Sequence, residues 1–172
     1  MSGPECEERR DLPYRDTKPV GAADFYFAIN ATFRFILERL GMEGLRRHWT
    51  DLGQNYFQPV GENWRRQGLP GVTAYWRAFF AAEPGAEVKI REDEDQVVVE
   101  VKVCPAIKHL REAGREIVPC FCQHCFHQGE AMAARAGMAY RLHGGNGACH
   151  HVIYRNRDGI PPQNLAEIKE AS

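Results

Sequence analysis

Four of the chain's six cysteines and three of its seven histidines lie between Val101 and His127. A cysteine thiolate is a nucleophile and a ligand for soft metals, and a neutral imidazole is a base and a common metal ligand. A fifth cysteine, Cys149, follows a glycine-rich segment and precedes two histidines. The pattern therefore indicates a metal site, a reactive thiol or a group of inert core cysteines.

The metal hypothesis starts from Cys122 and Cys125, whose C-x2-C spacing lets two thiolates share one ion. Structural zinc sites take four ligands, so folding must bring the remaining ones close. The candidate zinc ligands are Cys120, Cys122, Cys125, His143 and Cys149. An iron-sulfur cluster ranks below zinc, because C-x-C-x2-C matches none of the usual cluster spacings.

The nucleophile hypothesis rests on Cys104, which stands between a predicted strand and Pro105, a residue well tolerated at the first helical position. At the N-cap its sulfur would face free N–H groups and the positive end of the helix dipole, which lowers the pKa of a thiol. An inert buried cysteine is the alternative. The other candidates are Glu130 as a general base, and Arg135, Arg141 and His124 as substrate-binding residues. For Glu130, Arg135 and Arg141, a solvated position on the surface is the simpler interpretation.

The elements that must position these residues change in periodicity along the chain. Residues 22–41, 42–66 and 72–83 carry apolar side chains at helical spacing, and together they hold all three tryptophans. These aromatic residues could wall a ligand pocket as readily as fill a core. Residues 87–103 alternate with a period of two and predict a hairpin, and a second hairpin is expected for 138–155.

Two helices are expected between the hairpins, a short one over residues 105–113 and a longer one over 119–137. The register of the second hairpin stays open. A two-residue turn puts His143 opposite His150, whereas a four-residue loop puts Leu142 opposite Cys149. In both registers, alternation along the last strand predicts that His151 shares the face of Cys149.

The predicted fold is α+β, with a mostly antiparallel sheet and the N-terminal aromatic-rich helices packed against it. Its 172 residues, 44% of them apolar, suit a single folding unit. The expected boundaries are a disordered arm over 1–20, one domain over 21–158 and a tail over 159–172 that could hold a short helix.

The charge balance favours a small-molecule partner. Lys and Arg number 22 against 23 Asp and Glu, which offers no broad attraction for nucleic acid or an anionic membrane. No apolar run reaches the roughly 18 to 20 residues that a membrane span needs, and the N-terminus lacks a secretory signal. We therefore expect a cytoplasmic protein with reduced thiols. The sequence leaves the oligomeric state open, a homo-oligomer included.

The order of motifs over residues 97–153, from Cys104-Pro105 through Cys120-x-Cys122 to Cys149, resembles the L-2-amino-thiazoline-4-carboxylate hydrolase family. The resemblance implies thiol-dependent ring opening of a small cyclic C–N substrate by water. It makes Cys104, one of Cys120 or Cys122, and Cys149 the matching residues. The chain departs from that family in the extra cysteine and histidines after Cys122 and in the His-His pair after Cys149.

The pattern is more distantly similar to the vinyl-reductase-type small-ligand-binding domains. That resemblance implies a sensor module with a structural zinc, held by Cys122 or Cys125 together with His143 and Cys149, and a pocket formed by the aromatic helices. The sequence thus predicts a hydrolase with a Cys/His-rich, metal-binding site, and its alternative is a ligand-binding module without catalysis.

Overall fold

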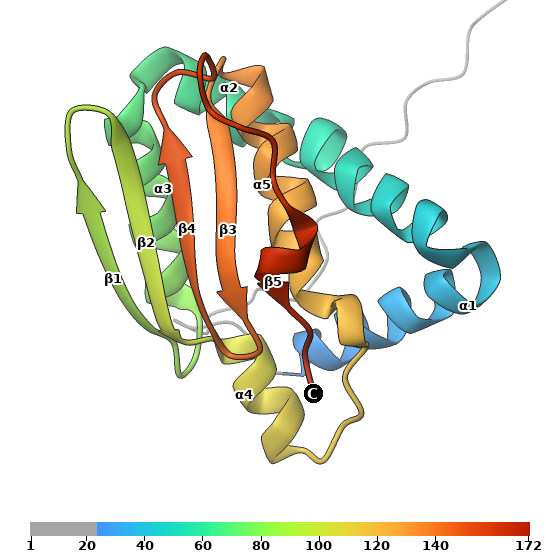
Figure 1. Ribbon diagram of the computed structural model, residues 1–172. Helices are drawn as coiled ribbons and strands as arrows, with labels where there is room; N and C mark the ends of the chain where they lie inside the picture. Colours follow the sequence, from blue (N-terminus) through green and yellow to red (C-terminus); the bar gives the residue numbers. More distant parts are fainter. Residues whose placement is uncertain (1–23) are drawn as a thin grey trace, which may run out of the picture.

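The computed structural model describes residues 24–172 and has an α+β fold (Figure 1). The arm predicted for residues 1–20 lies outside the described residues. The five strands are β1 (Glu87–Glu92), β2 (Gln96–Val103), β3 (Ala139–Gly145), β4 (Ala148–Tyr154) and β5 (Ile168–Lys169). They form one sheet in the order β1-β2-β4-β3-β5, in which only the short β3–β5 pairing is parallel. The predicted fold class is confirmed.

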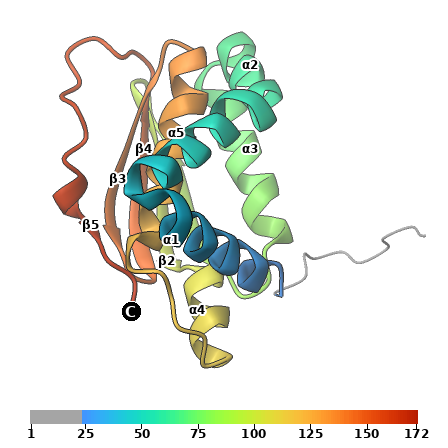
Figure 2. The ribbon, with the colours of Figure 1, turned by 90° about the vertical axis from the view of Figure 1, so that its right-hand side faces the viewer.

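The helices lie along one side of this sheet, except α4 (Pro105–Glu112), which lies at the end of the strands (Figure 2). They are α1 (Phe25–Asp51), α2 (Gln58–Gln67), α3 (Leu69–Ala82), α4 (Pro105–Glu112) and α5 (Gln123–Arg135), with a π-helical turn at Leu52–Tyr56 and a 3-10 turn at Pro119–Cys122. Helices α3 and α5 pack directly on the strands, whereas α1 and α2 contact α5. The helical part therefore has two layers, and α3 and α5 face the sheet.

Alternation along β2 sets the inner face of the sheet. Val97, Val99 and Val101 are buried under the helices, while Lys102 is exposed on the other face. Apolar side chains at every second position bury on one face of a pleated strand. Trp49 and Trp64, both fully buried, complete the core between the helices.

The helix boundaries follow local backbone chemistry. Gly41, the predicted end of the first helix, adopts φ 64° and ψ −173° and divides α1 at a kink. A glycine reaches this conformation at little steric cost. The next break falls at Phe57, two residues before Pro59, because proline is tolerated only in the first turn of the following helix.

The C-terminal segment differs from the expected tail. It contains β5 and a 3-10 turn at Leu165–Glu167 but no α-helix, and β5 pairs with the end of β3. Ile168 and Ala171 are buried, and the Ala171 N–H donates to the carbonyl of Pro119 at 2.9 Å. The buried side chains of Ile168 and Ala171 thus attach the C-terminal segment to the domain, although its composition suggested disorder.

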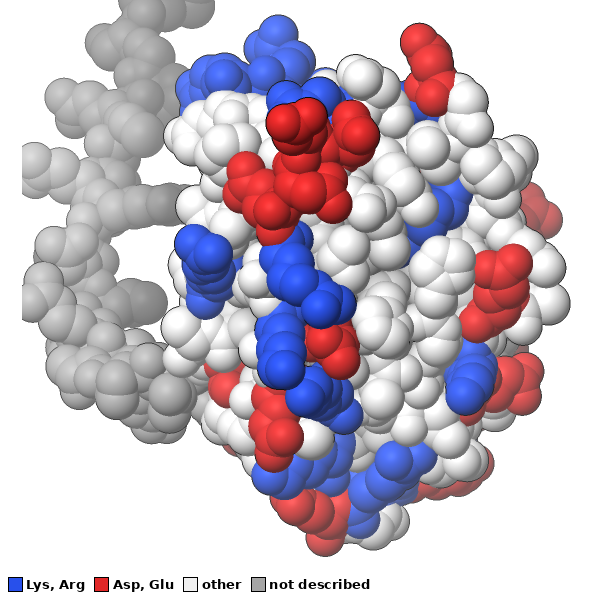
Figure 3. All heavy atoms as spheres, turned by 60° about the vertical axis from the view of Figure 1, so that its left-hand side comes forward, with Lys and Arg blue, Asp and Glu red and all other residues white. Residues whose placement is uncertain are grey.

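The face that carries the β1–β2 hairpin is mixed in charge, with acidic and basic side chains next to one another (Figure 3). One such contact is an ion pair of 3.7 Å between Arg91 and Glu100. No single-sign surface forms on this face. Within residues 24–172, no helix is long and apolar enough to cross a membrane.

Candidate functional site

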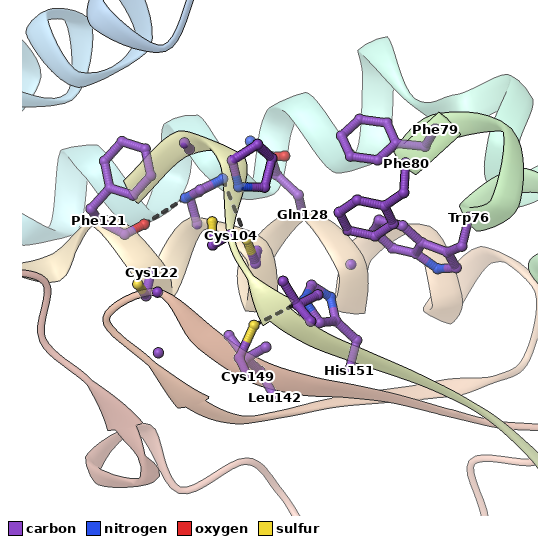
Figure 4. A pocket seen from close by; sticks show the side chains of 18 of the residues that line it. Trp76, Phe79, Phe80, Cys104, Phe121, Cys122, Gln128, Leu142, Cys149 and His151 are labelled. Atoms are coloured by element: carbon purple, nitrogen blue, oxygen red, sulfur yellow. Dashed lines mark hydrogen bonds between the residues drawn. The ribbon is translucent and has the colours of Figure 1, made fainter. Parts of the chain in front are cut away.

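A cavity of about 140 Å³ lies between the inner face of the sheet and helices α3 and α5 (Figure 4). Trp76, Phe79 and Phe80 of α3 form its aromatic end, and Cys104 and Cys122 lie toward the other end. Phe79 is 39% exposed, so this end meets solvent. The apolar wall and the small volume suit a compact, flat molecule.

Four thiols line this cavity, although they come from separate elements. Cys104 follows β2, Cys122 precedes α5, Cys125 is in the first turn of α5, and Cys149 is on β4. All five cysteines that the structure describes are free thiols. The convergence of sulfur atoms that the sequence suggested is therefore present for four of them.

The loop before α5 is held by a buried amide on α1. Asn30 donates to the carbonyl of Glu116 at 2.8 Å and accepts from the N–H of Val118 at 3.0 Å. This loop leads into the 3-10 turn that ends at Cys122. The Cys122 sulfur in turn accepts a hydrogen bond from the N–H of Asn146, at 3.3 Å, in the β3–β4 turn.

Cys104 is the N-cap residue of α4, as predicted, but its chemistry differs from the expectation. Its side chain makes no capping hydrogen bond, and burial raises the pKa of its thiol. The N–H groups of Ile107 and Ala106 act to lower this pKa and are outweighed. The prediction of a lowered pKa was wrong, because the apolar surroundings disfavour the thiolate more than the helix end favours it.

Two registers were considered for the second hairpin. The structure has the one with a two-residue turn, in which His143 lies opposite His150. Asn146 and Gly147 take positive φ angles of 55° and 108°, as such a turn requires. Cys149 and His151 share the inner face, as alternation predicted, and both line the cavity.

His151 joins Cys149 to Tyr140, a residue that the sequence analysis did not single out. The Nε2 atom of His151 lies 3.3 Å from the Cys149 sulfur, and its Nδ1 atom is hydrogen-bonded to the Tyr140 hydroxyl. Helix α5 passes so close to Tyr140 that a Cβ on Gly129 would lie 2.5 Å from the tyrosine ring. Gly129 therefore permits the contact that fixes this ring.

A second thiol–imidazole pair lies on α5. The Cys125 sulfur is 3.4 Å from Nε2 of His124, whose Nδ1 is hydrogen-bonded to the carbonyl of Phe121. The His124 ring packs against Phe33 and Phe121, with ring centroids 5.3 and 4.9 Å away. His124 was expected to bind substrate, and it does line the cavity.

The ionisable groups of the cavity are held in their neutral forms. Burial lowers the pKa of His124 to about 4 and the pKa of His151 to about 3. Burial also raises the pKa of Cys122 to about 11, and it raises the pKa of Cys125 and of Cys149 well above the usual value of a thiol. Low-dielectric surroundings penalise the charged form of each group. The pairs are therefore thiol and neutral imidazole.

Two polar atoms near the cavity have no hydrogen-bond partner among the described residues. They are the Tyr26 hydroxyl and the Trp76 indole N–H, both on residues that line the cavity. Gln128 also lines it, and Figure 4 shows its side chain among the lining residues. Buried polar groups normally have partners, so these atoms are candidates for contact with a bound molecule.

Several sequence-predicted site residues lie elsewhere. Cys120 is buried but does not line the cavity. The exposed His143 is on the outer face, 3.1 Å from the Glu167 carboxylate. Arg135 donates to the carbonyl of Gln54 at 3.1 Å on the far side of α5. These three side chains are not brought together with the four thiols.

Glu130 and Arg141 belong to a structural network outside the cavity. The Glu130 carboxylate contacts Arg157 at 2.7 Å and Arg141 at 3.2 Å, and it accepts from the Tyr140 N–H at 2.8 Å. Arg141, 8% exposed, also donates to the carbonyl of Pro161 at 2.7 Å. This network attaches α5 and the C-terminal segment to β3.

The predicted zinc ligands do not form a site in the described part of the chain. Cys122, Cys125 and Cys149 line one cavity, but Cys120 and His143 lie outside it. Over residues 24–172, no group of three or more Cys, His, Asp or Glu side chains is disposed to hold a metal ion. The donor set therefore does not fit one tetrahedral ion in this arrangement.

Comparison of the chain with protein-family models, with curated proteins and with solved structures gave no match. The side chains of the cavity therefore carry the functional interpretation.

Proposed function

We propose that this protein binds a small, flat, largely apolar molecule in the cavity beneath α3 and α5. The observation that carries the proposal is the cavity itself: aromatic rings of α3 form one end, the lining is mostly apolar, and four neutral thiols are among the residues that line the rest. An apolar cavity of roughly 150 Å³ is large enough to hold benzene, and the volume here is about 140 Å³. A single five- or six-membered ring is the matching size.

The polar atoms near the cavity give such a ligand an orientation. The Trp76 N–H is a donor without a partner in the described residues, and the Tyr26 hydroxyl can donate or accept. A heterocycle with one acceptor nitrogen would satisfy either group. A hydrocarbon of the same size would satisfy neither, which predicts a preference for the heterocycle.

The proposal is tested by calorimetric titration with thiazole and with toluene. We expect both to bind and thiazole to bind more tightly. Ala106→Phe fills the cavity from the start of α4, because the Ala106 side chain lines it, and is expected to weaken thiazole binding at least about tenfold. Ala134→Phe puts the same bulk on the exposed side of α5 and is the matched control. Absence of binding of both compounds to the unmodified protein would overturn the proposal.

A second candidate is thiol-dependent hydrolysis of a small cyclic C–N compound, the activity that the motif order suggested. Two thiol–imidazole pairs inside one cavity favour it, since nucleophile and base must be in hydrogen-bond contact. Glu130, the base expected from sequence, has its carboxylate occupied by two arginines, so an imidazole is the better candidate.

Incubation with 2-amino-thiazoline-4-carboxylate tests this activity by mass spectrometry, through the appearance of a product heavier by one water. Cys125→Ser is expected to abolish turnover if the Cys125–His124 pair acts, Cys149→Ser if the Cys149–His151 pair acts, and Cys104→Ser only if the nucleophile is the one that the motif order suggested. Cys120→Ser changes a cysteine outside the cavity and is the control. If the unmodified protein binds thiazole but forms no product, the hydrolase activity is contradicted and the binding function stands.

A further inference from the structure

The two imidazoles of the cavity carry their protons on opposite nitrogens. The carbonyl oxygen of Phe121 can only accept, so the Nδ1 atom of His124 must be the protonated nitrogen that donates to it. The neutral ring then has a lone pair on Nε2, which faces the Cys125 sulfur at 3.4 Å. The Cys125 S–H therefore donates to His124.

His151 has the reverse arrangement. The Tyr140 hydroxyl is completely buried, and His151 Nδ1 is the partner that the described residues give it. If the hydroxyl accepted from this nitrogen, its own proton would be buried without an acceptor, and a buried donor left unpaired is unfavourable. The hydroxyl therefore donates to Nδ1, and the Nε2–H of His151 points to the Cys149 sulfur.

This difference separates the four thiols by their neighbours. The Cys149 sulfur faces an N–H donor, and the Cys122 sulfur accepts from the Asn146 N–H. The side chain of Cys104 makes no capping hydrogen bond, and the neighbours that act on its sulfur are the N–H groups of Ala106 and Ile107. Among the cavity cysteines, Cys125 is the one whose S–H points to the lone pair of an imidazole nitrogen, on a ring that is itself held by a carbonyl. The Cys125 thiol, the His124 imidazole and the Phe121 carbonyl thus form a hydrogen-bonded chain of nucleophile, base and orienting group.

We propose that Cys125 is the nucleophile of the cavity, with His124 as its base, and that it adds to small flat molecules that carry a polarised double bond. This rests on the binding function proposed above and names the chemical class of the ligand. The Cys125 S–H proton passes to His124 Nε2 as sulfur bonds to the electrophilic carbon. The π pair moves to the neighbouring atom, which then takes the proton from the imidazolium. The net change is addition of S–H across the double bond.

N-methylmaleimide is a probe of this class, and N-methylsuccinimide is its saturated counterpart with the same shape. We expect N-methylsuccinimide to bind the full-length protein in a ligand-observed NMR experiment. We expect the part of maleimide labelling that N-methylsuccinimide suppresses to fall on Cys125, as mapped by peptide mass spectrometry. Cys125→Ala should remove that part and leave the other cysteines labelled as before.

His124→Gln is expected to slow the suppressible labelling at least about 100-fold, the usual contribution of a general base. His127→Gln is the matched control, because His127 is on the same helix, has an Nε2 atom without a partner in the described residues and does not line the cavity. If His124→Gln fails to fold, the position of the suppressible adduct in the unmodified protein still decides the question.

The outcomes separate the two proposals. If N-methylsuccinimide does not bind and suppresses no labelling, the binding function is contradicted. If it binds but the suppressible adduct lies on Cys104, Cys122 or Cys149, the role of Cys125 is wrong and the binding function stands. Equal labelling rates in His124→Gln and His127→Gln would likewise remove His124 as the base.

Discussion

The hydrogen bond between Tyr140 and His151 is the contact whose loss gives the clearest expected effect. Tyr140→Phe keeps the ring that packs against Gly129 and removes only the hydroxyl. His151, 3% exposed, then has an Nδ1 atom without a partner in either neutral tautomer. A buried polar group that loses its partner costs about 1–3 kcal/mol of unfolding free energy. We expect a loss of stability within this range.

Tyr26→Phe is the matched control for this change. The Tyr26 hydroxyl is also buried, but it has no hydrogen-bond partner among the described residues. Its removal therefore deletes no hydrogen bond, and the unfolding free energy should stay within about 0.5 kcal/mol or rise. Both variants lose one tyrosine hydroxyl. They differ in whether that hydroxyl has a hydrogen-bond partner.

Thermal unfolding followed by circular dichroism measures both variants. For a chain of this size, each kcal/mol corresponds to about 2–4 °C in Tm, so Tyr140→Phe should melt about 2–12 °C below the unmodified protein. Equal melting temperatures for Tyr140→Phe and Tyr26→Phe would refute the assignment of the Tyr140 proton to His151, and with it the opposite arrangement of the two imidazoles.

Three further predictions concern pH, charge and metal. Burial lowers the pKa of His124 to about 4 from 6.5, so as pH falls the unfolded chain binds the proton first; the stability from this neutral imidazole is present above pH 6.5 and is lost down to about pH 4. His124→Gln should therefore flatten the fall of Tm in this window, and an unchanged slope would contradict burial of a neutral His124 as its cause. Glu130→Gln should lower the unfolding free energy by about 1–3 kcal/mol and leave thiazole binding unchanged, because Glu130 lies outside the cavity; loss of binding would contradict its structural role. If the predicted zinc binds, protein purified without added metal should contain about one equivalent, and chelation should lower Tm substantially; an unchanged Tm would count against structural zinc.

The sequence predicted those features of the site that depend on local periodicity. Alternation along β4 put Cys149 and His151 on one face, and the residues before Pro105 predicted the N-cap position of Cys104. Both follow from two or three neighbouring residues. The register of the second hairpin was left open, because a run of three glycines and an asparagine permits positive φ in either turn.

The remaining features depend on contacts between distant elements. The direction of the Cys104 pKa shift is set by burial, which the residues beside it do not reveal. Tyr140 was not identified, because its importance comes from the cross-strand position of His151 and the close approach of α5 at Gly129. The C-terminal segment was expected to be a tail because its few apolar residues become buried only through contacts with distant elements, such as the pairing of β5 with β3 and the Ala171–Pro119 hydrogen bond.

The methionines allow the most direct test of the cavity as a binding site. Met132 lines the cavity, whereas Met42 and Met138 do not. In a ¹³C-methyl-methionine NMR titration with thiazole, we expect the Met132 signal to shift saturably while the Met42 and Met138 signals stay in place. Thiazole binding that leaves Met132 unchanged, or that moves all three signals alike, would contradict the cavity as the binding site.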